Sequence, residues 1–146
     1  MTPASPQPFE NPDDEAIRRL LAGARRIAVV GLSPKPHRDS HRVARYLIAQ
    51  GYEVIPVYPR EDTILGRPVF RQVRDITGGV DLVDVFRRSE QLPEVVEDSL
   101  LGRVPALWFQ LGCVHAAAAR RAVESGAIVV MDRCLMVEHE RLLGRS

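Results

Sequence analysis

Between positions 26 and 40 the chain reads Arg26-Ile27-Ala28-Val29-Val30-Gly31-Leu32-Ser33-Pro34-Lys35-Pro36-His37-Arg38-Asp39-Ser40. The part from Ile27 to Val30 is apolar and largely β-branched, which is typical of a buried strand. It breaks at Gly31 and enters a short loop that holds Lys35, the only lysine of the chain. Apolar residues at helical spacing follow as far as Gly51, so this region predicts a strand, a tight turn and a helix.

A strand–turn–helix unit of this kind is suited to binding a phosphate. The first backbone N–H groups of a helix have no partner within it and carry partial positive charge, so an anion fits there. Lys35 and Arg38 add two cationic side chains to the same loop. The alternative interpretation is that Gly31 only allows a tight turn. The cations beside the helix start favour phosphate binding.

Length and composition indicate one globular domain. The chain has 146 residues, of which 45% are hydrophobic and 27% charged, as in ordinary soluble proteins. A net charge of +1 creates no overall field for nucleic acid or a membrane surface. The sequence has no membrane-spanning apolar run and no secretory signal pattern. Since Cys113 and Cys134 form neither a metal pair nor a disulfide framework, we expect a cytoplasmic protein with reduced thiols.

Strand and helix patterns alternate along the chain. Strands are expected at 26–30, 53–57, 81–86, 106–111 and 128–131, and helices near 13–24, 40–50, 93–101, 115–125 and 137–143. The segment 61–79 is irregular. This alternation predicts a Rossmann-like three-layer α/β/α fold, with a mostly parallel five-stranded sheet in the order 3-2-1-4-5. We expect residues 1–11 to form a flexible tail before a single domain at 12–146.

The residues after the first two strands narrow the choice of nucleotide. A dinucleotide-binding loop would read G-x-G-x-x-G, but Ser33 and Pro36 occupy the second and third glycine positions. An NAD enzyme would also carry an acidic residue after its second strand. This chain has Tyr58-Pro59-Arg60 there, and a cation suits a ribose phosphate better than two free hydroxyls. NADP and coenzyme A (CoA) therefore both stay open.

A series of short motifs narrows the choice between NADP and CoA further. The motifs are Val30-Gly31-Leu32-Ser33-Pro34, Ser40-His41-Arg42-Val43, Gly51-Tyr52-Glu53-Val54-Ile55-Pro56-Val57-Tyr58-Pro59, Ile64-Leu65-Gly66, Val80-Asp81-Leu82-Val83-Asp84-Val85-Phe86-Arg87-Arg88, Trp108-Phe109-Gln110-Leu111-Gly112, Val130-Met131-Asp132-Arg133-Cys134-Leu135 and Glu138-His139. In this order and spacing the chain resembles the small CoA-binding protein family, stand-alone relatives of the CoA-binding domain of the succinyl-CoA synthetase α subunit. The resemblance covers roughly residues 25–142. It departs at Tyr58, where the family commonly has asparagine.

The resemblance implies a Rossmann-like domain with a CoA site built from residues that follow the strands. The CoA pyrophosphate would meet Gly31, Leu32, Ser33, Lys35, Arg38 and Ser40. The adenosine and its 3′-phosphate would be bordered by Tyr58, Pro59 and Arg60. The adenine side or the pocket rim would be lined by Val85, Phe86 and Arg87, and the pantetheine end would face Gln110 and Gly112.

The sequence offers no arrangement of a nucleophile with an oriented base, no metal-ligand cluster and no P-loop. We therefore expect no catalytic residue and no metal site, and a protein that binds CoA or acyl-CoA as a carrier, sensor or accessory protein. The alternative is an NADP-binding oxidoreductase or redox-sensor domain, and a third hypothesis is an interaction module with an empty crevice. Cys113 follows the Gln110–Gly112 turn, so a mixed disulfide with the CoA thiol is a further hypothesis.

Overall fold

The computed structural model describes residues 8–144, and its centre is a sheet of parallel strands. The strands are β1 (Arg26–Val30), β2 (Glu53–Val57), β5 (Leu82–Val85), β6 (Ala106–Phe109) and β7 (Ile128–Met131), and they lie side by side in the order β2-β1-β5-β6-β7. All neighbouring pairs among them are parallel. The predicted strands agree with these bounds to within two residues, and the Rossmann-like α/β class is confirmed.

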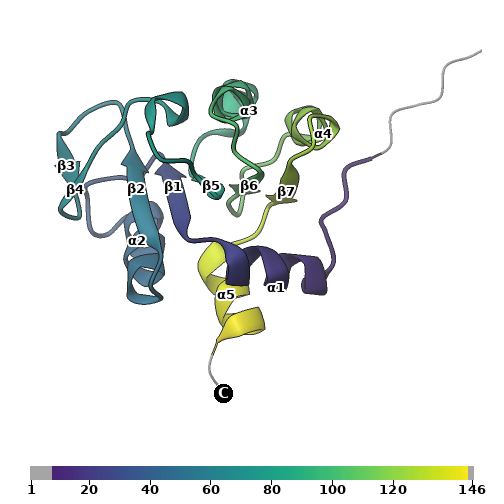
Figure 1. The fold of residues 1–146 in the computed structure, drawn as a ribbon, viewed down its shortest axis with the longest axis horizontal. Helices are drawn as coiled ribbons and strands as arrows, with labels where there is room; N and C mark the ends of the chain where they lie inside the picture. Colours follow the sequence, from purple (N-terminus) through teal and green to yellow (C-terminus); the bar gives the residue numbers. More distant parts are fainter. Residues whose placement is uncertain (1–7, 145–146) are drawn as a thin grey trace, which may run out of the picture.

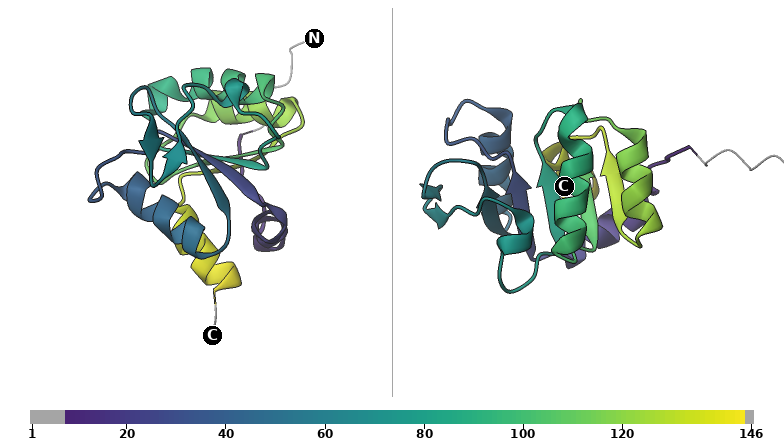
Figure 2. Two further views of the ribbon diagram at one scale, coloured as in Figure 1. Left: turned by 60° about the vertical axis from the view of Figure 1, so that its left-hand side comes forward. Right: turned by 90° about the horizontal axis from the view of Figure 1, so that it is seen from above.

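Helices cover both faces of the sheet and give three layers (Figure 1). One face carries α1 (Asp14–Gly23), α2 (Asp39–Ala49) and α5 (Leu135–Leu143). The other carries α3 (Leu92–Leu101) and α4 (Ala116–Glu124), which run side by side (Figure 2). Successive strand residues point to opposite faces, so Trp108 packs in the core under α1, α2 and α5 while Phe109 packs under α3 and α4. Among residues 8–144, no helix combines the length and the apolar character needed to cross a membrane.

The strand order differs in one place from the predicted 3-2-1-4-5. Numbered along the chain, the five strands stand in the order 2-1-3-4-5, because β5 pairs with β1 and not with the outer edge of β2. Within residues 8–144, that outer edge receives a single parallel bridge, between Val57 and Phe70. The winding of the sheet therefore reverses between β1 and β5, which is where α/β folds bind ligands.

The segment before β5 explains this difference. It forms a small antiparallel hairpin, β3 (Thr63–Ile64) and β4 (Arg67–Pro68), and then a short 3₁₀ helix, η1 (Val73–Asp75). A further 3₁₀ turn, η2 (Ser89–Gln91), leads into α3. Phe70, which follows the hairpin, donates to the Pro56 carbonyl at 2.9 Å and accepts from the Tyr58 N–H at 3.0 Å. The segment therefore occupies the outer edge of β2 itself, and β5 pairs with β1 on the other side.

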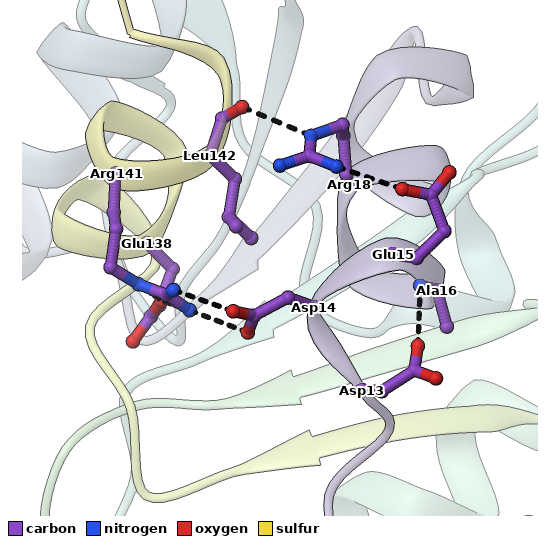
Figure 3. Close-up of polar contacts among 8 residues, drawn as sticks. All are labelled: Asp13, Asp14, Glu15, Ala16, Arg18, Glu138, Arg141 and Leu142. Atoms are coloured by element: carbon purple, nitrogen blue, oxygen red, sulfur yellow. Dashed lines mark hydrogen bonds and ion pairs between the residues drawn. The ribbon is translucent and has the colours of Figure 1, made fainter.

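Polar contacts on the surface attach the first helix to the last (Figure 3). The guanidinium of Arg141 donates to both carboxylate oxygens of Asp14 over 2.8 Å each, and it also pairs with Glu138 at 2.6 Å. Arg18 donates to the carbonyl of Leu142 at 3.3 Å. We call this group of four side chains the α1–α5 junction, meaning Asp14, Arg18, Glu138 and Arg141.

The segment before α1 is attached to the edge of the sheet. The Asn11 side chain donates to the carbonyl of Met131 at 3.0 Å and accepts from its N–H at 2.7 Å. Phe9 is partly buried against the core under α3 and α4. Most of the predicted tail, residues 1–7, lies outside the described residues.

Candidate functional site

Three adjoining cavities lie at the carboxyl ends of the strands, around the point where the winding reverses. The loop cavity has a volume of about 380 Å³ and is lined by residues of the β1–α2 connection, including Ser33, Lys35, Arg38 and Ser40. The arginine cavity, about 590 Å³, includes Arg71, Arg74 and Arg87. The glutamine cavity, about 840 Å³, includes Gln110, Leu111, Cys134, Met136 and Val137. Tyr58 lines all three, so together they form one crevice.

The β1–α2 loop is held in shape by its own side chains. The Ser40 hydroxyl accepts a hydrogen bond from the Ser33 N–H at 3.0 Å, and the Ser33 hydroxyl accepts one from the Lys35 N–H at 3.1 Å. The Nδ1 atom of His41 lies 2.9 Å from the Ser33 carbonyl oxygen. Ser40 and His41 are buried, while Lys35 and Arg38 are exposed at the loop surface. The loop is therefore pre-formed with its two cations free to meet an anion.

The start of α2 is suited to anion binding. Arg38 is the N-cap residue and makes no side-chain cap hydrogen bond. The His41 N–H donates to the Arg38 carbonyl at 3.1 Å, so the N–H groups of Asp39 and Ser40 are the ones left available in the first turn. Ser40, two residues after the cap, uses its hydroxyl to accept from the Ser33 N–H of the loop, as described above. Asp39 would repel an anion, but Arg42 pairs with its carboxylate.

Gly31 lets the end of β1 pass close to the end of β5. Its φ is +83°, and a Cβ atom at this position would lie 2.2 Å from the carbonyl oxygen of Phe86. The same segment is held by hydrogen bonds from Gly31 N–H to Val57 and from Phe86 N–H to Val30. Only glycine fits here without movement of the backbone. Gly31 thus brings the loop cavity and the glutamine cavity, both of which it lines, into contact.

Arg71 organises the loop after β2. Its Nη1 donates to the carbonyl oxygens of Tyr58, Arg60 and Glu61 at 2.8–3.0 Å. In the same cavity Arg74 pairs with Asp98 at 2.8 Å, and Arg87 donates to the amide oxygen of Gln91 at 3.2 Å. Within residues 8–144, neither Arg71 nor Arg87 has a carboxylate partner. Three acids, Glu94, Glu97 and Asp98, also line this cavity, and two of them are paired, Glu97 with Arg121 and Asp98 with Arg74. Arg71 and Arg87 therefore keep positive charge beside Tyr58 and Pro59.

A buried acid–amide pair lies beneath the glutamine cavity. Asp84 on β5 is fully buried, and its Oδ1 accepts a hydrogen bond of 2.6 Å from the Gln110 amide at the end of β6. Its second oxygen, Oδ2, has no hydrogen-bond partner among the described residues. Burial raises the pKa of Asp84 to about 7, against a smaller lowering by the Gln110 hydrogen bond. Asp84 holds the amide in place and leaves its Oε1 atom and second N–H for the cavity.

The Cys113 thiol in the crevice and the imidazoles of His115 and His139 outside it take structural roles. Cys113 is 8% exposed and donates to the Arg87 carbonyl at 3.1 Å, and burial raises the pKa of this thiol above its usual value. His115 accepts from the Ala118 N–H as the cap of α4, and His139 lies 2.7 Å from the Tyr46 hydroxyl. Residues 8–144 contain no group of three or more side chains placed to hold a metal ion. Of the two cysteines that line the glutamine cavity, Cys134 is the more exposed.

The structure brings most of the predicted site residues to the crevice. The residues that line at least one cavity are Gly31, Ser33, Lys35, Arg38, Ser40, Tyr58, Pro59, Phe86, Arg87 and Gln110. Four others line none of the three cavities. Leu32 and Val85 are fully buried in the core. The Arg60 carbonyl accepts a hydrogen bond from Arg71, and the Gly112 N–H donates to Asp132 at 2.8 Å.

Sequence reasoning missed residues whose contacts are distant in the chain. The sequence could have marked Asp84, because an acid inside the otherwise apolar run 82–86 needs a buried hydrogen-bond partner. Arg71 lies in the irregular segment, where no periodicity marks it. Met136 and Val137 belong to α5, whose start at Leu135 precedes the predicted one by two residues.

Comparison with known proteins gives a consistent result for most of the chain. A family model described as "CoA binding domain" matches residues 25–140. The uncharacterized protein YneT of Bacillus subtilis (strain 168) is 44% identical over 131 residues, which is 90% of this chain and 97% of YneT.

Solved structures extend the comparison to the fold. A hypothetical protein from Pyrococcus horikoshii OT3 is 40% identical and superimposes with a TM-score of 0.89, covering 97% of this chain and 99% of that one. An acetyl-coenzyme A synthetase of Ca. Korarchaeum cryptofilum superimposes with a TM-score of 0.69 at 23% identity. That match covers 80% of this chain but 28% of the synthetase, and it shows the shared fold alone.

Proposed function

The chain belongs to the CoA-binding domain family, and from that premise we propose that its crevice binds CoA or an acyl-CoA as a carrier, sensor or accessory protein. The observation that carries the proposal is the division of the crevice into three cavities of different character that meet at Tyr58. CoA likewise has three parts: an adenosine 3′-phosphate, a pyrophosphate and a pantetheine arm.

Each part of CoA has a chemically matching place in this proposal. The pyrophosphate lies in the loop cavity, where Lys35, Arg38 and the N–H groups at the start of α2 supply positive charge. The adenosine and its 3′-phosphate lie in the arginine cavity beside Tyr58 and Pro59, with Arg71 and Arg87 as the cations. The pantetheine arm crosses to the glutamine cavity, where the Gln110 amide can bond one of its amide groups.

A role without catalysis is supported by how the reactive side chains are used. The Cys113 thiol donates to a carbonyl. The imidazole Nδ1 atoms of His41, His115 and His139 lie within hydrogen-bond distance of a loop carbonyl, a helix cap N–H and a tyrosine hydroxyl. The exposed His37 has no oriented base in the proposed site. These groups serve the fold, and the site residues that remain are suited to binding.

The test is calorimetric titration of the purified protein with CoA, NADPH and ADP. We expect CoA to bind most tightly, and the double variant Lys35→Ala/Arg38→Ala to bind it at least about tenfold more weakly, since each charge-assisted contact contributes roughly 1.5–3 kcal/mol. The matched control is Arg19→Ala/Arg45→Ala, which removes two exposed cations that line none of the three cavities.

The outcomes separate the competing functions. Tighter binding of NADPH than of CoA would replace the proposal with an NADP-binding oxidoreductase or redox sensor. Unchanged CoA affinity in a folded Lys35→Ala/Arg38→Ala variant would remove the β1–α2 loop from the site. No binding of any nucleotide would favour an interaction module.

A further inference from the structure

Apolar side chains are exposed at the outer end of the glutamine cavity. Leu111, in the turn after β6, is 70% exposed, and Val137, in the first turn of α5, is 53% exposed. Both line this cavity, together with the partly buried Met136. We call Leu111, Met136 and Val137 the apolar rim. Single exposed apolar residues are common on proteins, but a group from two elements around one cavity indicates a ligand.

The chemistry of the rest of the crevice determines which ligand group would reach the rim. Cations are available in the loop cavity and the arginine cavity, so both phosphate-bearing parts of CoA are accounted for there. The pantetheine arm then enters the glutamine cavity past Gly31 and Phe86, which line both it and the loop cavity. Beyond Gln110 the lining includes Leu111 of the rim. The substituent on the CoA sulfur is therefore the part that meets the rim.

We propose that the apolar rim binds the hydrocarbon chain of an acyl-CoA, and that the protein prefers an uncharged medium-length acyl group to free CoA. The inference rests on the proposed function, because it places the sulfur by way of the phosphates. A bound chain would cover Leu111 and Val137, which are otherwise exposed to water, and the burial of this apolar surface supplies the affinity.

A carboxylate-terminated acyl chain is the competing ligand. Arg88 is exposed and lines the same cavity, so it offers a cation to such a chain. Arg42 also lines it but already pairs with Asp39. Butyryl-CoA and succinyl-CoA distinguish the two, since their acyl groups both contain four carbons and differ in the charge at the end.

The experiment measures Kd by calorimetry for CoA and for its acetyl, butyryl, hexanoyl and succinyl thioesters. A fully buried methylene changes Kd by roughly fourfold, and a rim open on one side should give roughly half of that effect in free energy. We therefore expect hexanoyl-CoA to bind about tenfold more tightly than acetyl-CoA, and butyryl-CoA more tightly than succinyl-CoA.

Because Leu111 and Val137 are exposed, replacing them should leave the fold intact. In Leu111→Ser/Val137→Ser we expect the ratio of the acetyl-CoA and hexanoyl-CoA Kd values to fall from about ten to about two. The matched control is Leu101→Ser/Val123→Ser, which removes two apolar side chains, 63% and 49% exposed, that do not line the cavity. This control should keep the full ratio. Because each ratio is measured within one variant, a general loss of affinity cancels.

Three results would overturn the inference while leaving CoA binding intact. They are a wild-type ratio near one, succinyl-CoA binding more tightly than butyryl-CoA, and a full ratio in Leu111→Ser/Val137→Ser. Failure of the proposed function looks different, because then CoA itself does not bind and no ratio can be measured.

Discussion

The α1–α5 junction and the Asp84–Gln110 pair are both polar contacts between elements far apart in the sequence, but they differ in burial and in pairing. At the junction the Asp14 and Arg141 side chains are about half exposed while Glu138 is 13% exposed, and both carboxylate oxygens of Asp14 are bonded to Arg141 (Figure 3). Under the glutamine cavity Asp84 is fully buried and one of its oxygens lacks a partner among the described residues.

The backbone shows the same contrast. Next to the crevice, Gly31 and Asp132 have φ values of +83° and +63°, whereas the junction is built from two regular helices. An unpaired buried polar group costs stability, and such groups concentrate where a protein binds or reacts. The difference indicates that the carboxyl edge of the sheet is shaped for a ligand and the junction for the fold.

The largest expected effect is at Gly31. In Gly31→Ala the new methyl group would overlap the Phe86 carbonyl at a positive φ, so we expect a loss of more than about 4 kcal/mol in unfolding free energy, measured by urea denaturation. The control is Gly51→Ala. Gly51 also has a positive φ, +97°, but has open space around it, so that variant should lose only about 1 kcal/mol. Equal losses in the two variants would show that close approach at Gly31 is unimportant.

The second effect is at Asp84, where a substitution should raise the free energy of unfolding instead of lowering it. Because burial raises the pKa of Asp84 to about 7, the folded state holds a proton that the unfolded carboxyl releases near 3.8. Stability should therefore fall as the pH rises from about 4 to about 7, by an amount on the order of 4 kcal/mol, and then stay level.

The variant Asp84→Asn removes this charge while its side-chain oxygen can still accept from Gln110. We expect urea denaturation to show Asp84→Asn more stable than wild type at about pH 8, with an advantage that shrinks as the pH falls and vanishes at about pH 4 and below. Other titrating groups, such as His139, act in both proteins and cancel in the difference. A constant difference between the two proteins across this range would mean that Asp84 does not titrate there, and the contrast with the α1–α5 junction would lose its energetic basis.

Positions of strands and helices could be predicted because they depend on local patterns. The apolar run Ile27–Val30 and the Pro93 that precedes a helical pattern are readable from neighbouring residues alone. The order of the strands in the sheet could not be predicted from local patterns in the same way. Nothing in the apolar run of β5 indicates whether it pairs with β1 or outside β2, and the outer edge of β2 is taken by Phe70 of the irregular segment.

The site divides in the same way. Ser33, Lys35 and Arg38 belong to one short loop, so their grouping follows from the chain itself. Asp84 acquires its role only through Gln110, which is 26 residues later. Arg71 acquires its role only by meeting three carbonyls of the loop after β2. Contacts of this kind appear when the strands are placed side by side.

The smallest expected effect is at the α1–α5 junction. In Arg141→Ala we expect the melting temperature to fall by at most about 3 °C at neutral pH, because exposed ion pairs are screened by water. Hydrogen bonding to Arg141 lowers the pKa of Asp14 below 3.8. The contribution of the pair is therefore present above that pH and lost as the pH falls through the lowered pKa. About 1 M sodium chloride should reduce the difference in melting temperature in the same way.

Arg141→Lys serves as the control, because it keeps the charge but cannot bond both Asp14 oxygens in the same plane. It should lie between wild type and Arg141→Ala at low salt. A loss in Arg141→Ala that persists in high salt and at low pH would show that the methylene groups of Arg141 stabilise the helix pair by packing. In that case burial, rather than pairing of charges, would be the property that separates the two regions.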